Sequence, residues 1–166
     1  MEALLKSFLT IVCIFILNLN NLLAQVPADT TRYEDGSVFI GWGLINGIIN
    51  GQGEMIWTNG TRYNGHWKKN TEDGYGTMYW ANGDVYAGQW KNGLRHGKGK
   101  MIWTTGDVYE GYWKDDTQEG KGKMEWADGG SYKGQFKNNL VDGKGTMKYK
   151  TGMTYKGKWK NNEFVK

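Results

Sequence analysis

The chain has 166 residues, a formal net charge of +4 at pH 7, and 26 glycines alongside nine tryptophans and ten tyrosines. This length has room for one domain or one array of repeats. The many aromatic residues exclude a disordered chain, and the absence of a glycine at every third position excludes collagen. The mild charge gives no reason by itself to expect a polyanion such as nucleic acid as a partner.

Residues 1–24 resemble a helical secretory signal peptide. Lys6 precedes an apolar run, and cleavage is expected after Ala24. The alternative is an uncleaved membrane anchor, although the strongly apolar part, residues 8–17, is short of the roughly 20 residues that span a bilayer. Cys13, the only cysteine, lies in this run, so a cleaved chain has no disulfide or thiolate site. We therefore expect an exported protein, which is secreted, periplasmic or at the cell surface.

After a polar lead-in at residues 25–38, the rest of the chain is a repeat of about 23 residues. The four full units from Tyr63 begin Y-x-G-x-W, with Phe136 in place of the last tryptophan, continue to a G-x-G pair, and have a glycine three residues before the next unit. The first unit is weaker, with Phe39 and Gly43 at the tyrosine and tryptophan positions. The array covers residues 39–166, divided as 39–62, 63–85, 86–108, 109–131, 132–154 and a partial unit at 155–166. The expected repeat core is Tyr63, Gly65, Trp67, Tyr86, Gly88, Trp90, Tyr109, Gly111, Trp113, Tyr132, Gly134, Phe136, Tyr155, Gly157 and Trp159.

The pattern within a unit has a period of two, which is typical of strands. The aromatic and glycine positions of residues 63–67 share one face of a strand, and residues 74–80 form a second strand after a loop. Asn82 and Gly83 are expected to turn the chain back, because both residues tolerate positive φ. The sequence therefore predicts an all-β fold, an elongated single antiparallel sheet of stacked β-hairpins.

The aromatic face of this sheet is the expected core. Glycine weakens a strand unless something needs the space that it leaves. Large rings need that space, and each buries about 150–250 Å². We expect the sheet to curl around the aromatic face, because a flat single sheet leaves one side of the rings in water.

The pattern Y-x-G-x-W with a following G-x-G, repeated at this step from residue 39 to 166, resembles the MORN repeat family. The resemblance implies an interaction module. Junctophilins, plant phosphatidylinositol-phosphate kinases and some lysine methyltransferases carry such repeats, which are connected with membrane attachment and protein scaffolding. No catalytic residues reside in the repeat, and no kinase or methyltransferase domain accompanies it here. The signal peptide departs from these examples, which face the cytosol.

Catalytic, cofactor and metal sites are not expected. His66 alternates onto the polar face of its strand and His96 lies in a loop, and neither has the spacing of a metal ligand. The G-x-G pairs precede strands, so they are not phosphate loops at the start of a helix. Acidic residues gather where turns are expected, and Asp favours turns for local backbone reasons. The chain is therefore predicted not to be an enzyme.

Lysines concentrate on the polar face of the later units. The candidate anion- or lipid-binding face consists of Lys98, Lys100, Lys121, Lys123, Lys133, Lys137, Lys144, Lys148, Lys156, Lys158 and Lys160. These lysines either bind anionic lipid or glycolipid head groups, or keep the sheet face soluble and protect a sheet edge from aggregation.

The expected partners are an anionic membrane lipid, a protein, or both, and no nucleic acid. In the alternative to lipid binding, the array is a protein-interaction scaffold that uses exposed aromatic residues such as Tyr75, Tyr79 and Tyr112. The strand at residues 155–160 leaves a sheet edge that could pair with a partner or a second copy. Its three lysines disfavour open-ended stacking but are compatible with a discrete homodimer.

Overall fold

The computed structural model describes residues 29–165, and these residues form strands and turns without any helix. The expected signal peptide, residues 1–24, and residues 25–28 of the lead-in lie outside the described residues. Within residues 29–165 no helix could cross a membrane. The strands are β1 (Asp29–Arg32), β2 (Val38–Gly41), β3 (Leu44–Ile45), β4 (Ile48–Ile49), β5 (Gly51–Ile56), β6 (Arg62–Lys68), β7 (Thr71–Tyr79), β8 (Val85–Lys91), β9 (Leu94–Ile102), β10 (Val108–Lys114), β11 (Thr117–Glu125), β12 (Ser131–Lys137), β13 (Leu140–Lys148), β14 (Thr154–Lys160) and β15 (Glu163–Phe164).

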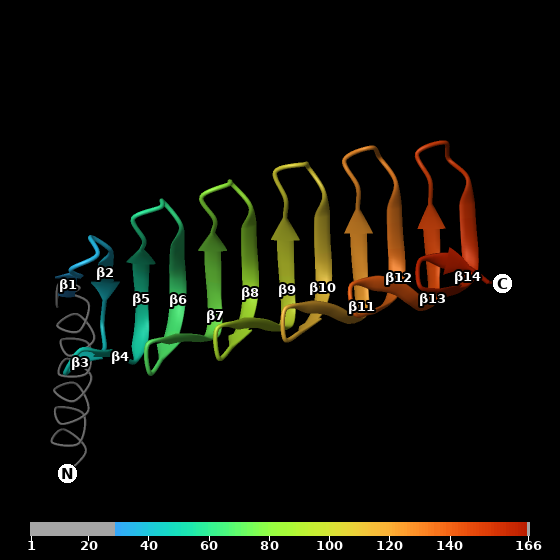
Figure 1. Ribbon diagram of the computed structural model, residues 1–166. Coiled ribbons are helices and arrows are strands. Elements are labelled where there is room, and N and C mark those ends of the chain that lie inside the picture. The colour runs from blue at the N-terminus through green and yellow to red at the C-terminus, as the bar shows by residue number, and fades with distance from the viewer. Residues whose placement is uncertain (1–28, 166) are drawn as a thin grey trace, which may run out of the picture.

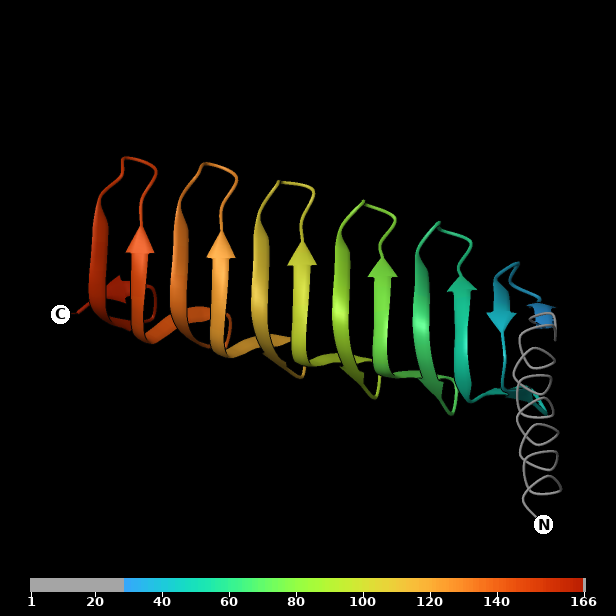
Figure 2. The ribbon, with the colours of Figure 1, turned by 180° about the vertical axis from the view of Figure 1, so that it is seen from behind.

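Thirteen of these strands form one sheet, in the order β1-β2-β5-β6-β7-β8-β9-β10-β11-β12-β13-β14-β15. Each strand pairs in antiparallel fashion with its neighbour, and β3 and β4 form a separate two-stranded hairpin. Figures 1 and 2 show a single row of upright hairpins that runs from β1 at one end to β14 at the other. The prediction of an all-β, elongated single antiparallel sheet of stacked hairpins is confirmed for the described residues.

Two kinds of turn join the strands. At the upper end in Figure 1, the Trp80 N–H donates to the Asp84 carbonyl (3.0 Å), and Gly83 has a φ of 92°. The turn predicted at Asn82 and Gly83 is therefore present, and of these two residues only Gly83 has a positive φ. Turns with two successive positive φ values occur instead at the lower end, in the segment predicted to be a loop. Lys69 (50°) and Asn70 (64°) form one such two-residue turn.

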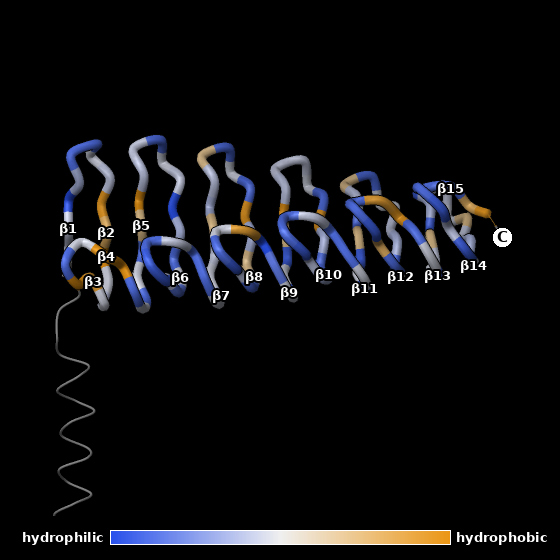
Figure 3. Tube along the Cα trace, turned by 60° about the horizontal axis from the view of Figure 1, so that its bottom comes forward, coloured by the Kyte–Doolittle hydropathy of each residue, from blue (hydrophilic) through white to orange (hydrophobic). Residues whose placement is uncertain are grey.

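Each hairpin also bends near its lower end. The first glycine of the G-x-G pair has a left-handed backbone, with φ of 107° at Gly74 and 110° at Gly143. Beside it the register of β6 against β7 shifts between Gly65 and Trp67, which is the mark of a β-bulge. Figure 3 shows the lower ends turned away from the direction of the upright strands. The expected curvature is thus concentrated at these bends.

The core is a continuous stack of perpendicular aromatic rings. Tyr86 is fully buried, with its ring centroid 5.1 Å from that of Trp90 in the same unit and 5.5 Å from that of Trp113 in the next unit. The Tyr86 hydroxyl donates to the Gln89 carbonyl (3.0 Å). The aromatic residues predicted for the core are buried with one exception, Tyr155, which is 41% exposed.

A row of glycines crosses the sheet beneath the tyrosine rings. Gly88 lies opposite Gly76 on one side and opposite Gly99 on the other, and this pairing recurs along the array. A Cβ atom on Gly99 would overlap the hydroxyl of Tyr86. The rings therefore occupy the space that the missing side chains leave, as the sequence predicts.

Candidate functional site: a groove on the outer face of the sheet

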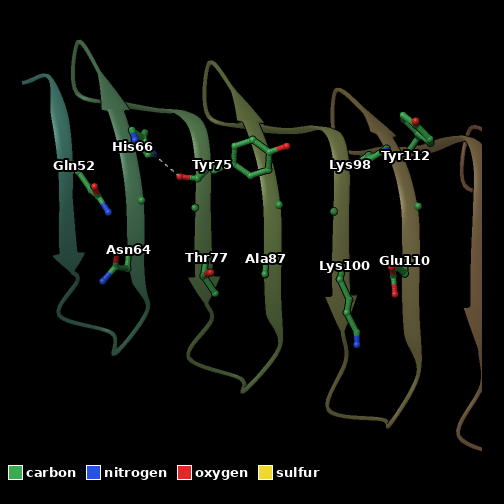
Figure 4. Close-up of a pocket in the computed structure, with 15 residues that line it drawn as sticks. Gln52, Asn64, His66, Tyr75, Thr77, Ala87, Lys98, Lys100, Glu110 and Tyr112 are labelled. Atoms are coloured by element: carbon green, nitrogen blue, oxygen red, sulfur yellow. Dashed lines mark hydrogen bonds between the residues drawn. The ribbon is translucent and has the colours of Figure 1, made fainter.

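The outer face of the sheet carries two rows of side chains, one on each side of the glycine row. Ala87, Lys100 and Glu110 lie opposite one another in the first row, and Lys98 and Tyr112 in the second. Between the rows, the glycine backbone forms the floor of a groove. Over β5 to β10 this groove has a volume of about 780 Å³ (Figure 4).

The part of the groove over β5 to β10, which we call the neutral section, is partly aromatic, and its charged residues are Lys98, Lys100 and Glu110 near its C-terminal end. Gln52, Asn64 and Thr77 project from its walls (Figure 4), and Tyr75 is 60% exposed. Tyr112, 44% exposed, stands at the far end of this section, with the Lys98 ammonium 5.6 Å from its ring centroid. Side chains with a flat apolar surface and a polar tip are common in protein interfaces.

The groove continues towards the C-terminus between lysines. Two further hollows, of about 610 and 580 Å³, lie over β10 to β14 and share Lys144. We call this section the lysine groove, and its lysines are Lys121, Lys123, Lys133, Lys144, Lys156 and Lys158. All six are exposed. Their ammonium groups can attract anions that lie along the sheet.

The other lysines of the candidate face lie elsewhere. Lys98 and Lys100 line the C-terminal end of the neutral section. Lys148 is at the upper end of β13, beside the turn at Tyr149. Lys137 and Lys160 end their strands at the lower side, and Lys160 forms an ion pair of 3.0 Å with Asp142. The structure therefore gathers eight of the eleven lysines along the groove.

Two carboxylates interrupt the positive charge, and the sequence analysis did not include them. Glu110 lies opposite Lys100 on one side and Lys123 on the other, in the same row. Glu125 forms an ion pair of 2.8 Å with Lys123. Glu110 could have been found from strand alternation alone, because it falls between the inward positions of Tyr109 and Gly111. The positive charge without a nearby carboxylate is therefore strongest on the C-terminal side of Lys123.

The histidines make contacts within the sheet. The Nδ1 atom of His66 lies 3.0 Å from the Tyr75 carbonyl oxygen, and that of His96 lies 3.3 Å from Asp115 Oδ1. In the described part of the chain, no group of three or more His, Cys, Asp or Glu residues could hold a metal ion.

The acidic and amide residues of the turns link each unit to another. Asp84 Oδ1 accepts a hydrogen bond from the Thr104 N–H (2.8 Å), which with further hydrogen bonds lowers the pKa of the Asp84 carboxyl. At the lower end, Asn139 Oδ1 accepts from the Gln118 N–H (2.7 Å), and Asn162 Oδ1 from the Val141 N–H (2.8 Å). These side chains satisfy backbone donors of the preceding or following unit.

The Arg95 side chain links its own unit to the next unit. Its Nε donates to Asp116 Oδ1 (2.8 Å), and its guanidinium lies 4.4 Å from the ring centroid of Trp113. Arg62 covers the ring of Tyr79 in a similar way, at 4.2 Å from the centroid. Tyr79 is therefore less available than Tyr75 and Tyr112 as a contact residue.

The repeating sequence that forms this core and glycine row is matched by a family profile. The MORN repeat profile matches residues 44–62, 63–85, 86–108, 109–131 and 132–154. The chain belongs to the MORN repeat family. Its repeats make it a repeat-containing protein of the kind that serves in binding and scaffolding.

Other comparisons add little about this MORN protein. No match to a curated protein is found. Among solved structures, the TCP domain of SAS-4 (dCPAP) of Drosophila melanogaster, in complex with a proline-rich motif of Ana2 (dSTIL), is similar at 13% sequence identity. The similarity covers 79% of this chain and 90% of that chain, with a TM-score of 0.33. A similarity this low carries no argument about function.

Proposed function

We propose that this MORN protein is a non-enzymatic, exported binding and scaffold protein that docks on anionic lipid or glycolipid head groups through its lysine groove. One observation carries the proposal: six exposed lysines line one continuous section of the outer face. Lysines near a negatively charged membrane surface each contribute about 1 kcal/mol of attraction. The contacts of the histidines and turn residues with the sheet support a role without catalysis.

The geometry of the groove suits a flat array of head groups. Successive strands lie about 4.8 Å apart, so the lysines over β11 to β14 extend for roughly 15 Å along the sheet. The lysine side chains stand on either side of a glycine floor, and in the described residues all but Lys123, which pairs with Glu125, are free to reach a surface. Exposed charges of this kind are screened beyond about 10 Å at 0.1 M salt, so binding should weaken as salt rises.

Export rests on the apolar N-terminal segment and is tested separately. Expression of the full chain with a C-terminal tag, followed by fractionation and mass measurement, should give an extracytoplasmic protein that is shortened by 24 residues. A full-length protein in the membrane fraction would favour the alternative of an uncleaved anchor. A full-length protein in the cytoplasm would contradict export.

Lipid docking is tested by sedimentation of the full chain with anionic and with neutral vesicles at low and physiological salt. We expect binding to anionic vesicles only, lost as salt rises. In a triple variant, Lys121→Glu, Lys133→Glu and Lys144→Glu, this binding should fall at least ten-fold. The matched control changes the same net charge at the exposed lower ends, through Lys68→Glu, Lys91→Glu and Lys114→Glu, and should bind nearly as the parent does. All variants keep the N-terminal segment, so its contribution is common to them.

A second function, in protein scaffolding without lipid binding, is favoured by the neutral section of the groove. Tyr75 and Tyr112 are exposed there on a rigid sheet. Equal sedimentation of the parent and the lysine-groove variant with anionic vesicles would dismiss lipid docking. Partners whose capture survives those lysine changes but is lost with Tyr75→Ala and Tyr112→Ala would favour the scaffold.

A further inference from the structure

The walls of the neutral section contain hydrogen-bonding side chains that the sheet does not use. Asn64 and Thr77 lie opposite each other in the first row, and Gln52 stands in the second row (Figure 4). Within the described residues, none of these three side chains makes a hydrogen bond. The Gln89 side chain differs, because its Oε1 atom accepts from the Lys98 N–H (2.8 Å). The walls therefore offer two amides and a hydroxyl, which can both donate and accept.

Two exposed tyrosines stand in the second row of the same section. Tyr75 is on β7 and Tyr112 is on β10, in the row that also contains Lys98 (Figure 4). They are 60% and 44% exposed. Three strand spacings separate them, which is about 14 Å along the groove. Each ring offers a flat apolar surface with a polar tip to a ligand that lies in the groove.

Charge sets this section apart from the lysine groove. Over β5 to β8, no lysine, arginine, aspartate or glutamate is among the described residues that line it. At its C-terminal end, Lys100 lies opposite Glu110, and the Lys98 ammonium is 5.6 Å from the centroid of the Tyr112 ring. A phosphate group would find no cation along most of this section. Its chemistry therefore suits an uncharged ligand that is rich in hydroxyl groups.

The floor of the section offers no backbone partner to a protein segment. Each strand from β6 to β9 is paired on both sides, so its backbone donors and acceptors are engaged in the sheet. An extended peptide binds a sheet by adding to an unpaired edge. Here a ligand lies across paired strands and must be recognised by the wall side chains alone.

The spacing of the strands matches a chain of sugars. Strands lie about 4.8 Å apart, and a chain of β-1,4-linked pyranoses advances by roughly 5 Å per sugar, so each sugar lies over one strand. From β5 to β10 the section is roughly 24 Å long, which is room for about five sugars. Its volume of about 780 Å³ is within the range of about 300–1,000 Å³ that is usual for ligand sites. On one strand the two rows are about 7 Å apart at their Cα atoms, so equatorial hydroxyls can reach both walls.

We propose that the neutral section binds a linear, uncharged glycan of β-1,4-linked pyranoses, which lies across β5 to β10. Tyr75 and Tyr112 stack on the C–H faces of two of its sugars. Gln52, Asn64 and Thr77 exchange hydrogen bonds with its hydroxyl groups. This site is separate from the lysine groove and needs neither a lipid nor a protein partner.

Two hexasaccharides serve as probes, cellohexaose and the β-1,4-linked hexamer of N-acetylglucosamine. They share the linkage and differ in the substituent at C2. Binding is measured by titration calorimetry with the full chain, and amide chemical shifts locate the site. We expect saturable binding with shifts confined to β5 to β10. Binding of both supports recognition of the shared chain, and binding of one supports a site that also reads the substituent.

Shape and length provide two further tests. Maltohexaose has α-1,4 linkages that curve the chain away from a straight groove, so it should bind at least ten-fold more weakly than the better hexasaccharide. The corresponding disaccharide covers only part of the section and should also bind at least ten-fold more weakly. Equal binding of either control would overturn a site that extends over several strands.

Substitutions of exposed side chains test the contacts. Tyr75→Ala should weaken binding at least ten-fold, whereas Tyr75→Phe keeps the ring and should bind within two-fold of the parent. Asn64→Ala should weaken binding roughly three-fold. The matched control is Tyr149→Ala, because Tyr149 is 41% exposed but lies at an upper turn outside the neutral section. This variant should bind as the parent does, and circular dichroism checks that each variant is folded.

The outcome for the glycan is independent of the outcome for lipid docking. Binding of an uncharged glycan should persist as salt rises, whereas lipid docking should weaken. Absence of binding by both hexasaccharides, or equal binding by Tyr75→Ala and the parent, would overturn the proposal. A protein partner that is captured through Tyr75 while neither hexasaccharide binds would also overturn it, in favour of the scaffold. Each of these results leaves the lysine groove to be judged by vesicle sedimentation.

Discussion

Trp90 packs edge-on against Tyr63 of the preceding unit, with 5.4 Å between ring centroids and 85° between the ring planes. It makes the same kind of contact with Tyr86 of its own unit, at 5.1 Å and 89°. The Trp90 indole N–H donates to the Gly76 carbonyl (3.2 Å). One side chain thus joins two units, because β7 belongs to the preceding hairpin.

Trp90→Ala should therefore destabilise two neighbouring units together. Removal of a buried aromatic side chain costs about 3–5 kcal/mol, and the Gly76 carbonyl also loses its donor. Urea unfolding followed by circular dichroism measures the loss. Tyr75→Ala, at a position that is 60% exposed, is the control and should change the free energy of unfolding by less than about 0.5 kcal/mol. A loss below about 1 kcal/mol for Trp90→Ala would contradict the expected coupling.

The two asparagines of one lower turn should differ in importance. Asn138 (φ 49°) and Asn139 (φ 65°) both have left-handed backbones, but only the Asn139 side chain accepts a hydrogen bond from the Gln118 N–H. Glycine tolerates this conformation, and Gly93 occupies the slot of Asn139 in another unit. Asn139→Gly should lower the free energy of unfolding by roughly 1–2 kcal/mol more than Asn138→Gly does, because a backbone donor loses its partner. Equal losses in thermal unfolding would show that the hydrogen bond contributes nothing.

The core could be predicted from the sequence because the spacing of its residues along the chain identifies them without knowledge of the neighbouring strands. A tyrosine, a glycine and a tryptophan at alternate positions, as at Tyr63, Gly65 and Trp67, indicate one face of a strand wherever the strand lies. The lower turns could not be predicted, because Lys69 rarely adopts a positive φ. Contacts with the preceding unit hold this turn, since the Asn70 N–H donates to the Ile49 carbonyl (3.0 Å) and Asn70 Oδ1 accepts from the Ile49 N–H (2.6 Å).

The candidate site was predictable along the middle of the strands and less so at their ends. Alternation places residues such as Lys133 on the outer face without further information. It cannot say that Lys160 pairs with Asp142 of the neighbouring strand, or that Lys148 lies beside an upper turn. The groove itself depends on glycines that face one another across strands. That relationship follows from register, which the bulge between Gly65 and Trp67 shifts.

The buried tyrosines should make the protein sensitive to alkali. Burial raises the pKa of Tyr63, Tyr86, Tyr109 and Tyr132 above the ordinary value of about 10. Above pH 10 the unfolded chain loses these protons while the folded chain keeps them, so stability is fully present below pH 10 and falls as pH rises. Each buried phenol should contribute a slope of up to about 1.4 kcal/mol per pH unit.

Denaturant unfolding at several pH values between 9 and 12 measures this slope. Tyr109→Phe keeps the ring but removes one ionisable group, so the slope should decrease by the contribution of one tyrosine. In ultraviolet titration of the parent, the four buried tyrosines should ionise only together with the loss of the circular dichroism signal. A slope that Tyr109→Phe leaves unchanged would contradict the assignment.

Equivalent tyrosines of different units should differ in their contribution to stability. Tyr109 is fully buried between Trp113 and Phe136, whereas Tyr155 is 41% exposed. Tyr109→Ala should cost about 3–5 kcal/mol, as large core truncations do. Tyr155→Ala should cost well under half of that, because much of its side chain is already in water and the rings that it packs against, Tyr149 and Phe164, are themselves exposed. Urea unfolding of both variants gives the comparison, and equal losses would mean that Tyr155 is already covered in solution.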